Sequence, residues 1–96
     1  MGIFNLFRKK KEVDLERQRR EHLLQNGRIC DGTIIDSETH ESGSEIVYYF
    51  YTVHGVDFES SELLTAEQMR EPLKYAPGAK VGVRFDPKQH GNSMLE

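Results

Sequence analysis

The chain has 96 residues, a formal net charge of −3, 36% hydrophobic residues, 30% charged residues and a single cysteine. This length suffices for one small domain with a thin core, and the composition is that of an ordinary soluble protein and not of a disordered or membrane one. One thiol cannot cross-link a secreted domain, and the sequence has neither an apolar run long enough to span a bilayer nor a secretory signal, so we expect a cytoplasmic protein.

Charge is unevenly distributed along the chain. Residues 1–27 carry seven Lys or Arg against four Asp or Glu, whereas residues 28–96 carry six against twelve. A basic arm joined to an acidic body predicts two parts with different partners. We therefore divide the chain into a basic N-terminal helical arm over residues 1–27 and a domain over residues 28–96, whose acidity disfavours nucleic acid.

The first eleven residues, MGIFNLFRKKK, combine an apolar helical face with a run of cations. This pattern is typical of a short amphipathic anchor that attaches to an anionic membrane surface. The membrane-anchor candidates are Ile3, Phe4, Phe7, Arg8, Lys9, Lys10 and Lys11. The alternatives are a frayed terminus and a tail that packs on the domain.

Residues 9–27 are predicted to form a helix, because they lack proline and internal glycine and are rich in Glu, Arg, Leu and Gln. Asn26-Gly27 is a fitting end, since glycine accepts the left-handed cap conformation. The few apolar residues form no continuous stripe, so most of this helix should be solvated. They are Val13, Leu15, Leu23 and Leu24.

Beyond Gly27 the pattern favours strands. RICDGTIIDSETH predicts the first strand, and EIVYYFYTVHGVDFESS predicts a hairpin that turns at His54-Gly55, where Gly55 supplies a positive φ. Counting from this turn pairs Val53 with Val56. Alternation then assigns six side chains to the core: Val47, Tyr49, Tyr51, Val53, Val56 and Phe58.

The opposite face of the hairpin presents three large apolar residues in a row, Ile46, Tyr48 and Phe50. We identify them as candidates for binding a protein partner or a second copy of the chain. Coverage by leucines of the N-terminal helix is an alternative. Stacking of nucleic-acid bases is another, although Asp57 and Glu59 on the same face would repel phosphates.

The second half of the domain predicts a short helix and another strand. Thr65 can cap the helix with Gln68 at capping-box spacing, and Pro72 ends it. The strand AKVGVRFDP follows a Pro-Gly turn. Its inward residues are Val81, Val83 and Phe85.

The last residues predict closure of a barrel. After Asp86-Pro87, residues 88–92 should turn the chain, and residues 93–96 should form a short strand that pairs with the first. Met94 or Leu95 should then pack near Cys30 or Ile34. A terminal Leu-Glu pair is also a common cloning remnant, in which case Met94 would be the last native residue.

These elements predict a mostly-β fold, a small five-stranded barrel with an N-terminal helical arm and a short helix before the fourth strand. We prefer an SH3-like barrel to an OB-like one, because the predicted last strand is short.

Three segments, GTIID, YTVHGVDFESS and PGAKVGVRFDPKQHGNSMLE, resemble a family of small bacterial domains of unknown function. The family pattern runs through a Gly-x-Val/Ile strand, an aromatic strand with a Gly turn, and a Gly-x-x-Val-x-Val-x-Tyr-Asp-Pro close, in which Phe85 replaces the usual tyrosine. The resemblance covers about residues 28–96 and implies a small mostly-β barrel without a catalytic residue. Other members often lie beside transmembrane helices.

Catalytic and metal-binding patterns are weak. The four histidines lack the paired spacing of zinc ligands, so we expect no metal and no cofactor. Cys30 alternates with Gly32 and Ile34, which predicts a buried structural thiol. Acidic residues that could serve a hydrolase are Glu38, Glu41, Glu45, Glu59 and Glu62.

The sequence therefore predicts a non-enzymatic binding or interaction module of the bacterial cytoplasm, peripheral to the inner membrane if the arm attaches there. A nucleic-acid-binding barrel and a hydrolase that uses loop carboxylates are the alternatives.

Overall fold

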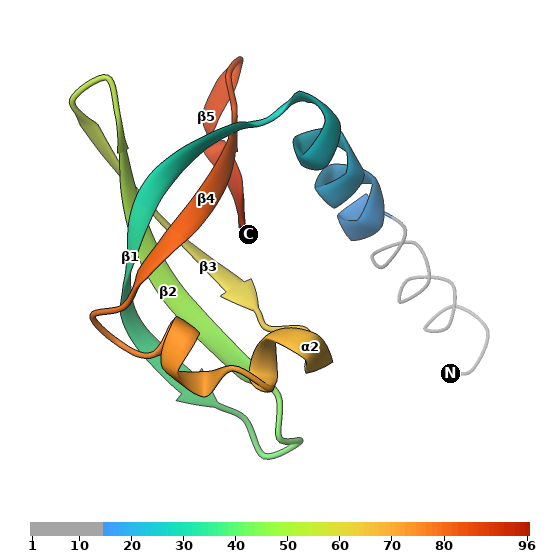
Figure 1. The fold of residues 1–96 in the computed structure, drawn as a ribbon. Coiled ribbons are helices and arrows are strands. Elements are labelled where there is room, and N and C mark those ends of the chain that lie inside the picture. Colours follow the sequence, from blue (N-terminus) through green and yellow to red (C-terminus); the bar gives the residue numbers. More distant parts are fainter. Residues whose placement is uncertain (1–14) are drawn as a thin grey trace.

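The protein is described by a computed structural model over residues 15–96, and the predicted anchor residues lie outside the described part (Figure 1). Five antiparallel strands form a nearly closed barrel with the sheet order β3-β2-β1-β4-β5. The strands are β1 (Arg28–Thr39), β2 (Glu45–Val53), β3 (Val56–Leu63), β4 (Lys80–Asp86) and β5 (Gln89–Leu95). The short helices α2 (Ala66–Met69) and η1 (Pro72–Tyr75) precede β4. The structure confirms the predicted mostly-β barrel, the N-terminal helix and the short helix before the fourth strand.

The N-terminal helix runs from residue 15 to residue 26 of the described chain. Gly27 ends it and donates its N–H to the Leu23 carbonyl over 2.8 Å. The predicted left-handed cap is wrong, because Gly27 has no positive φ. Glycine is needed here for another reason: a Cβ would collide with the Leu23 carbonyl oxygen.

The β2–β3 hairpin has the predicted register, with Val53 opposite Val56 and Tyr51 opposite Phe58. His54 and Gly55 both have positive φ, 51° and 80°, the conformation of a type I′ turn, which suits the right-handed twist of the strands. The short loop thus fixes which side chains face inward.

Four of the six predicted core residues of the hairpin are buried: Val47, Tyr49, Tyr51 and Val53. Phe58 is half-buried and packs against the core. The prediction for Val56 is wrong, because its side chain is 55% exposed. Val56 follows the turn on an edge strand, and the hairpin tip extends beyond the barrel wall (Figure 1).

The last strand pairs differently from the prediction. β5 pairs with β4, with Val83 opposite Leu95, and β1 already has β2 and β4 as neighbours. The Asp86 carboxylate accepts the Lys88 N–H over 2.8 Å, so the chain reverses at once and β5 begins at Gln89. Leu95 is buried in the same core cluster as Ile34, as predicted.

The other local predictions for this half are confirmed. Thr65 and Gln68 form the reciprocal capping box at the start of α2. The inward residues of β4 are buried: Val81, Val83 and Phe85.

Candidate functional site

The barrel has a seam between β3 and β5, the two edge strands of the sheet, which contact each other without being neighbours in the pairing order. Side chains bridge the seam. Both carboxylate oxygens of Glu62 on β3 accept the Leu95 N–H, at 3.3 and 3.4 Å. The hydroxyls of Tyr49 and Ser93 lie 2.7 Å apart.

The N-terminal helix contacts both sides of this seam. Arg19 donates to the Ser93 carbonyl over 2.6 Å and to the Asn92 side chain over 3.3 Å, which attaches the helix to β5. The His22 imidazole lies 3.3 Å from the Asp86 carboxylate at the end of β4. Of the helix leucines in the described chain, Leu23 is fully buried, so an apolar contact and these polar contacts together attach the helix.

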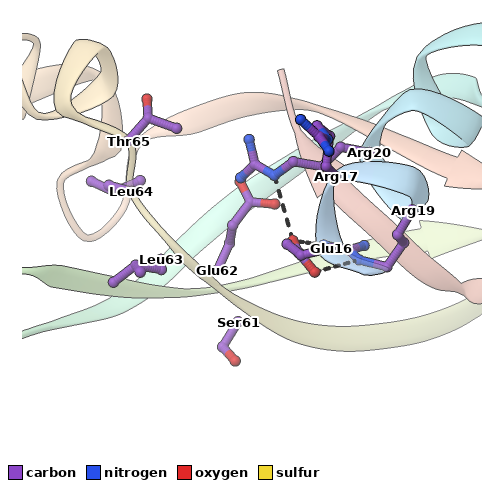
Figure 2. A pocket seen from close by; sticks show the side chains of 9 residues that line it. All are labelled: Glu16, Arg17, Arg19, Arg20, Ser61, Glu62, Leu63, Leu64 and Thr65. Atoms are coloured by element: carbon purple, nitrogen blue, oxygen red, sulfur yellow. Dashed lines mark hydrogen bonds and ion pairs between the residues drawn. The ribbon is translucent and has the colours of Figure 1, made fainter. Parts of the chain in front are cut away.

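A cleft of about 600 Å³ lies between this helix and the end of β3 (Figure 2). One wall consists of Glu16, Arg17, Arg19 and Arg20, and the other of Ser61, Glu62, Leu63, Leu64 and Thr65. Glu16 pairs with Arg19 at 2.7 Å and with Arg20 at 3.4 Å. Arg20 also lies 3.5 Å from Glu62. Figure 2 shows the Arg20 guanidinium directed between the two carboxylates.

The two carboxylates of the cleft differ in their surroundings. The Glu62 side chain is only 3% exposed, and this burial raises its pKa, against the opposing effects of Arg20 and of the Leu95 N–H. The hydrogen bond from Arg19 is the main cause that lowers the pKa of Glu16. The cleft therefore brings together two acids that share one arginine, an arrangement that the sequence did not reveal because Glu16 lies on the helix.

A second candidate site lies on the outside of β1, β2 and β3. We call it the outer apolar face, and it consists of Ile35, Ile46, Tyr48, Phe50 and Leu63. Leu63 lies opposite Ile46, and Ile35 is the extra residue of a β-bulge in β1. Leu63, Ile35 and Phe50 are 54%, 44% and 38% exposed, while Ile46 and Tyr48 are half-buried.

Carboxylates border the outer apolar face on both sides. On β1, Asp36 lies opposite Tyr48 and Glu38 lies opposite Ile46. On β3, Glu59 lies opposite Phe50, and Asp57 follows the same alternation. The Tyr48 hydroxyl donates to Glu38 over 3.0 Å, which raises the pKa of Tyr48. Tyr48 thus connects the apolar stripe to its acidic border.

The structure places the predicted candidates Ile46, Tyr48 and Phe50 together on this face, and their role in binding stays a prediction. Sequence reasoning missed Leu63, although alternation along β3 could have identified it. It also missed Ile35, whose position depends on the bulge. The described contacts of the N-terminal helix lie at the seam, and its Leu15 and Leu24 are exposed, so residues 15–26 do not cover this face.

The other predicted chemical groups do not form a site. Within residues 15–96, no three His, Cys, Asp or Glu side chains are placed to hold a metal ion. Cys30 is predicted to be buried, but it is only half-buried. This partial burial is the main cause that raises the pKa of its thiol. The His90 ring packs at the barrel end against Phe58, Phe85 and His54, a contact that the sequence did not reveal.

A family model for a domain of unknown function, DUF3592, matches residues 26–96. The chain belongs to the DUF3592 family. This match covers every strand of the barrel and confirms the resemblance to a family of small domains of unknown function. No curated protein and no solved structure matches the chain. In the part of this DUF3592 protein that the structure describes, no helix is long and apolar enough to cross a membrane.

Proposed function

We propose that the protein is a non-enzymatic interaction module that binds a protein partner through the outer apolar face. One observation carries the proposal: five large apolar side chains lie side by side on an outward face that no described part of the chain covers. Contiguous exposed apolar patches with polar borders are characteristic of protein-binding surfaces, and aromatic residues such as Phe50 and Tyr48 are common anchors there.

The acidic border favours a partner of opposite charge. Two copies of this face brought together would place the carboxylates of Asp36, Glu38, Asp57 and Glu59 near their equivalents, and like charges at an interface are costly. A different protein with basic residues around an apolar centre fits better than a homodimer. The same carboxylates disfavour a nucleic-acid backbone.

The contacts in the seam cleft support a structural role for its two acids. Glu62 is nearly inaccessible to solvent and pairs with Arg20, while Glu16 pairs with both Arg19 and Arg20. General acid–base catalysis requires a carboxyl group that can reach a substrate. We therefore assign the cleft to the stability of the fold and the outer apolar face to binding.

Affinity capture from an extract of the source organism tests this function, with the wild type compared with two surface variants. Phe50→Ser should lose a specific partner. Leu73→Ser is the matched control, because Leu73 is the most exposed of the large apolar residues described and lies on η1, which contributes no residue to the face. Equal capture by both variants would contradict the proposal.

A second candidate function is peripheral attachment to the inner membrane surface through residues 3–11, with the protein located in the cytoplasm. The sequence pattern supports it, since Ile3, Phe4 and Phe7 precede four consecutive cations. Each such cation contributes about 1 kcal/mol near an anionic surface. Wild type should sediment with anionic vesicles, and a Phe4→Ser, Phe7→Ser variant should stay in the supernatant. A wild type that also stays in the supernatant would rule out the attachment.

A further inference from the structure

The described chain starts, at Leu15, close to the β3 edge of the outer apolar face. Glu16 and Arg17 line the same cleft as Ser61 and Leu63. These two β3 residues lie opposite Tyr48 and Ile46, on the outer side of the barrel. The described chain therefore starts at the β3 border of this face.

The distance across the face is short compared with the length of the arm. Adjacent strands lie about 4.8 Å apart, so the path from β3 over β2 to β1 is about 10 Å. Even in a helix, which rises about 1.5 Å per residue, the fourteen residues ahead of Leu15 would span about 21 Å. The arm is long enough to cover the face of its own barrel.

The chemistry of the arm complements that of the face. The face offers an apolar stripe with Asp36 and Glu38 on one side and Asp57 and Glu59 on the other. Residues 3–11 supply four large apolar side chains, those of Ile3, Phe4, Leu6 and Phe7, and then four cations. Apolar contact along the stripe and opposite charges at its border would both favour association.

We propose that residues 3–11 dock on the outer apolar face of the same molecule, with Ile3, Phe4 and Phe7 against the stripe and residues 8–11 against its acidic border. The inference rests on the proposed function, because it takes the same face to be a binding surface. It adds a means of regulation: the arm occupies the face until a partner protein displaces it, or until an anionic membrane binds the arm.

Paramagnetic relaxation enhancement in the full chain tests the docking. A nitroxide is attached at position 5 in an Asn5→Cys, Cys30→Ser protein, and backbone amide signals are compared before and after the label is reduced. The amides of Tyr48, Phe50 and Leu63 should lose most of their intensity while the label is oxidised. Unchanged intensities at these three amides would overturn the proposal.

Two arm variants test the chemistry of the contact. The double variant Phe4→Ser, Phe7→Ser keeps the cations of the arm. The double variant Lys9→Glu, Lys10→Glu keeps its apolar residues. Each should restore much of the intensity that the amide signals of the face lose in the labelled protein. Phe50→Ser should act likewise, with Leu73→Ser as the control that changes nothing. Broadening that survives both arm variants would overturn the assigned contact.

A mixed sample identifies the molecule that supplies the arm. Spin-labelled protein without isotope is mixed with isotope-labelled protein without a spin label, so that broadening can arise only between molecules. The proposal predicts no broadening at the face in this sample. Broadening here would assign the arm to a second copy and overturn the docking within one molecule.

Failure of this inference is distinct from failure of the proposed function. If the label leaves the face unaffected while Phe50→Ser loses its captured partner, the arm proposal fails and the partner-binding face stands. If the label broadens the face and capture does not depend on Phe50, the face binds the arm alone.

Discussion

The seam cleft and the outer apolar face adjoin at β3, where Leu63 borders both, and they differ in how many contacts their side chains make within the molecule. In the cleft, Arg20 contacts both acids, and Glu62 accepts the Leu95 N–H. On the face, Phe50 and Leu63 remain exposed beside carboxylates that make only local hydrogen bonds, such as that of Glu38 with Tyr48. A cleft with paired charges resembles an active site, yet its contacts join the helix to the barrel, whereas the face has exposed apolar side chains that the described chain does not cover.

Removing the end of β5, which forms one side of the seam, should have the largest effect on stability. Deleting residues 92–96 removes Ser93 and Leu95, which Tyr49 and Glu62 contact across the seam. It also leaves the core cluster without Leu95. We expect the cooperative unfolding transition to be lost, as measured by circular dichroism during heating. A truncated chain that melts like the full chain would show that β5 is dispensable.

Tyr51→Ala should cause the second-largest loss of stability. Tyr51 is buried, stacks on Tyr49, Phe58 and Phe85, and donates its hydroxyl to the His90 carbonyl over 2.5 Å. Removing a buried aromatic side chain costs about 3 to 5 kcal/mol, which chemical denaturation can measure. A loss as small as that of a surface substitution would mean that Tyr51 does not face the core.

Arg20→Ala should cost less, about 2 kcal/mol, because Arg20 is partly exposed while the Glu62 charge that it leaves behind is buried. Glu62→Gln is the matched control, since it removes that charge and keeps the shape. Arg20→Ala should therefore cost less in the Glu62→Gln protein than in the wild type. An equal loss of stability in both proteins would mean that the ion pair is not the cause.

The stability of Arg20→Ala should depend on pH in a defined direction. Burial raises the pKa of Glu62 in the folded state above its unfolded value, and loss of Arg20 removes an effect that lowers it. A carboxyl group with a raised folded pKa penalises folding increasingly as pH rises through that pKa. The variant should therefore regain stability relative to wild type as the pH falls from neutral toward the ordinary carboxyl range. Glu62→Gln should abolish this difference, and an unchanged gap across pH would contradict it.

Phe50→Ser should have the smallest effect on stability, a loss of about 1 kcal/mol, because Phe50 is partly exposed and serine is less favourable than phenylalanine in a strand. Phe50 lies next to Tyr51 in the sequence but on the opposite side of the sheet. Comparing Phe50→Ser with Tyr51→Ala therefore distinguishes the outer face of β2 from its inner face, since only Tyr51 should contribute to the core. Thermal melting of both variants measures this difference.

The sequence was most informative where short-range rules decide the structure. The His54-Gly55 turn fixed the hairpin register, and Thr65 with Gln68 marked the start of α2. These features depend on dihedral preferences and hydrogen bonds within a few residues.

Long-range contacts account for what could not be predicted. The pairing of β5 depends on the neighbours that β1 already has, and the burial of Glu62 depends on a helix forty residues away in the sequence. The bulge at Ile35 shifts the alternation of β1 locally, so that counting along the chain misses one residue of the outer apolar face.

The most direct test of the division between the two surfaces is the free energy of unfolding of Arg20→Ala and Phe50→Ser, measured side by side in urea at neutral pH. We expect a loss of about 2 kcal/mol for Arg20→Ala in the cleft and a smaller loss, about 1 kcal/mol, for Phe50→Ser on the face. A stable Arg20→Ala together with a strongly destabilised Phe50→Ser would contradict this expectation, because the outer apolar face would then belong to the structural core and the cleft would be available for binding.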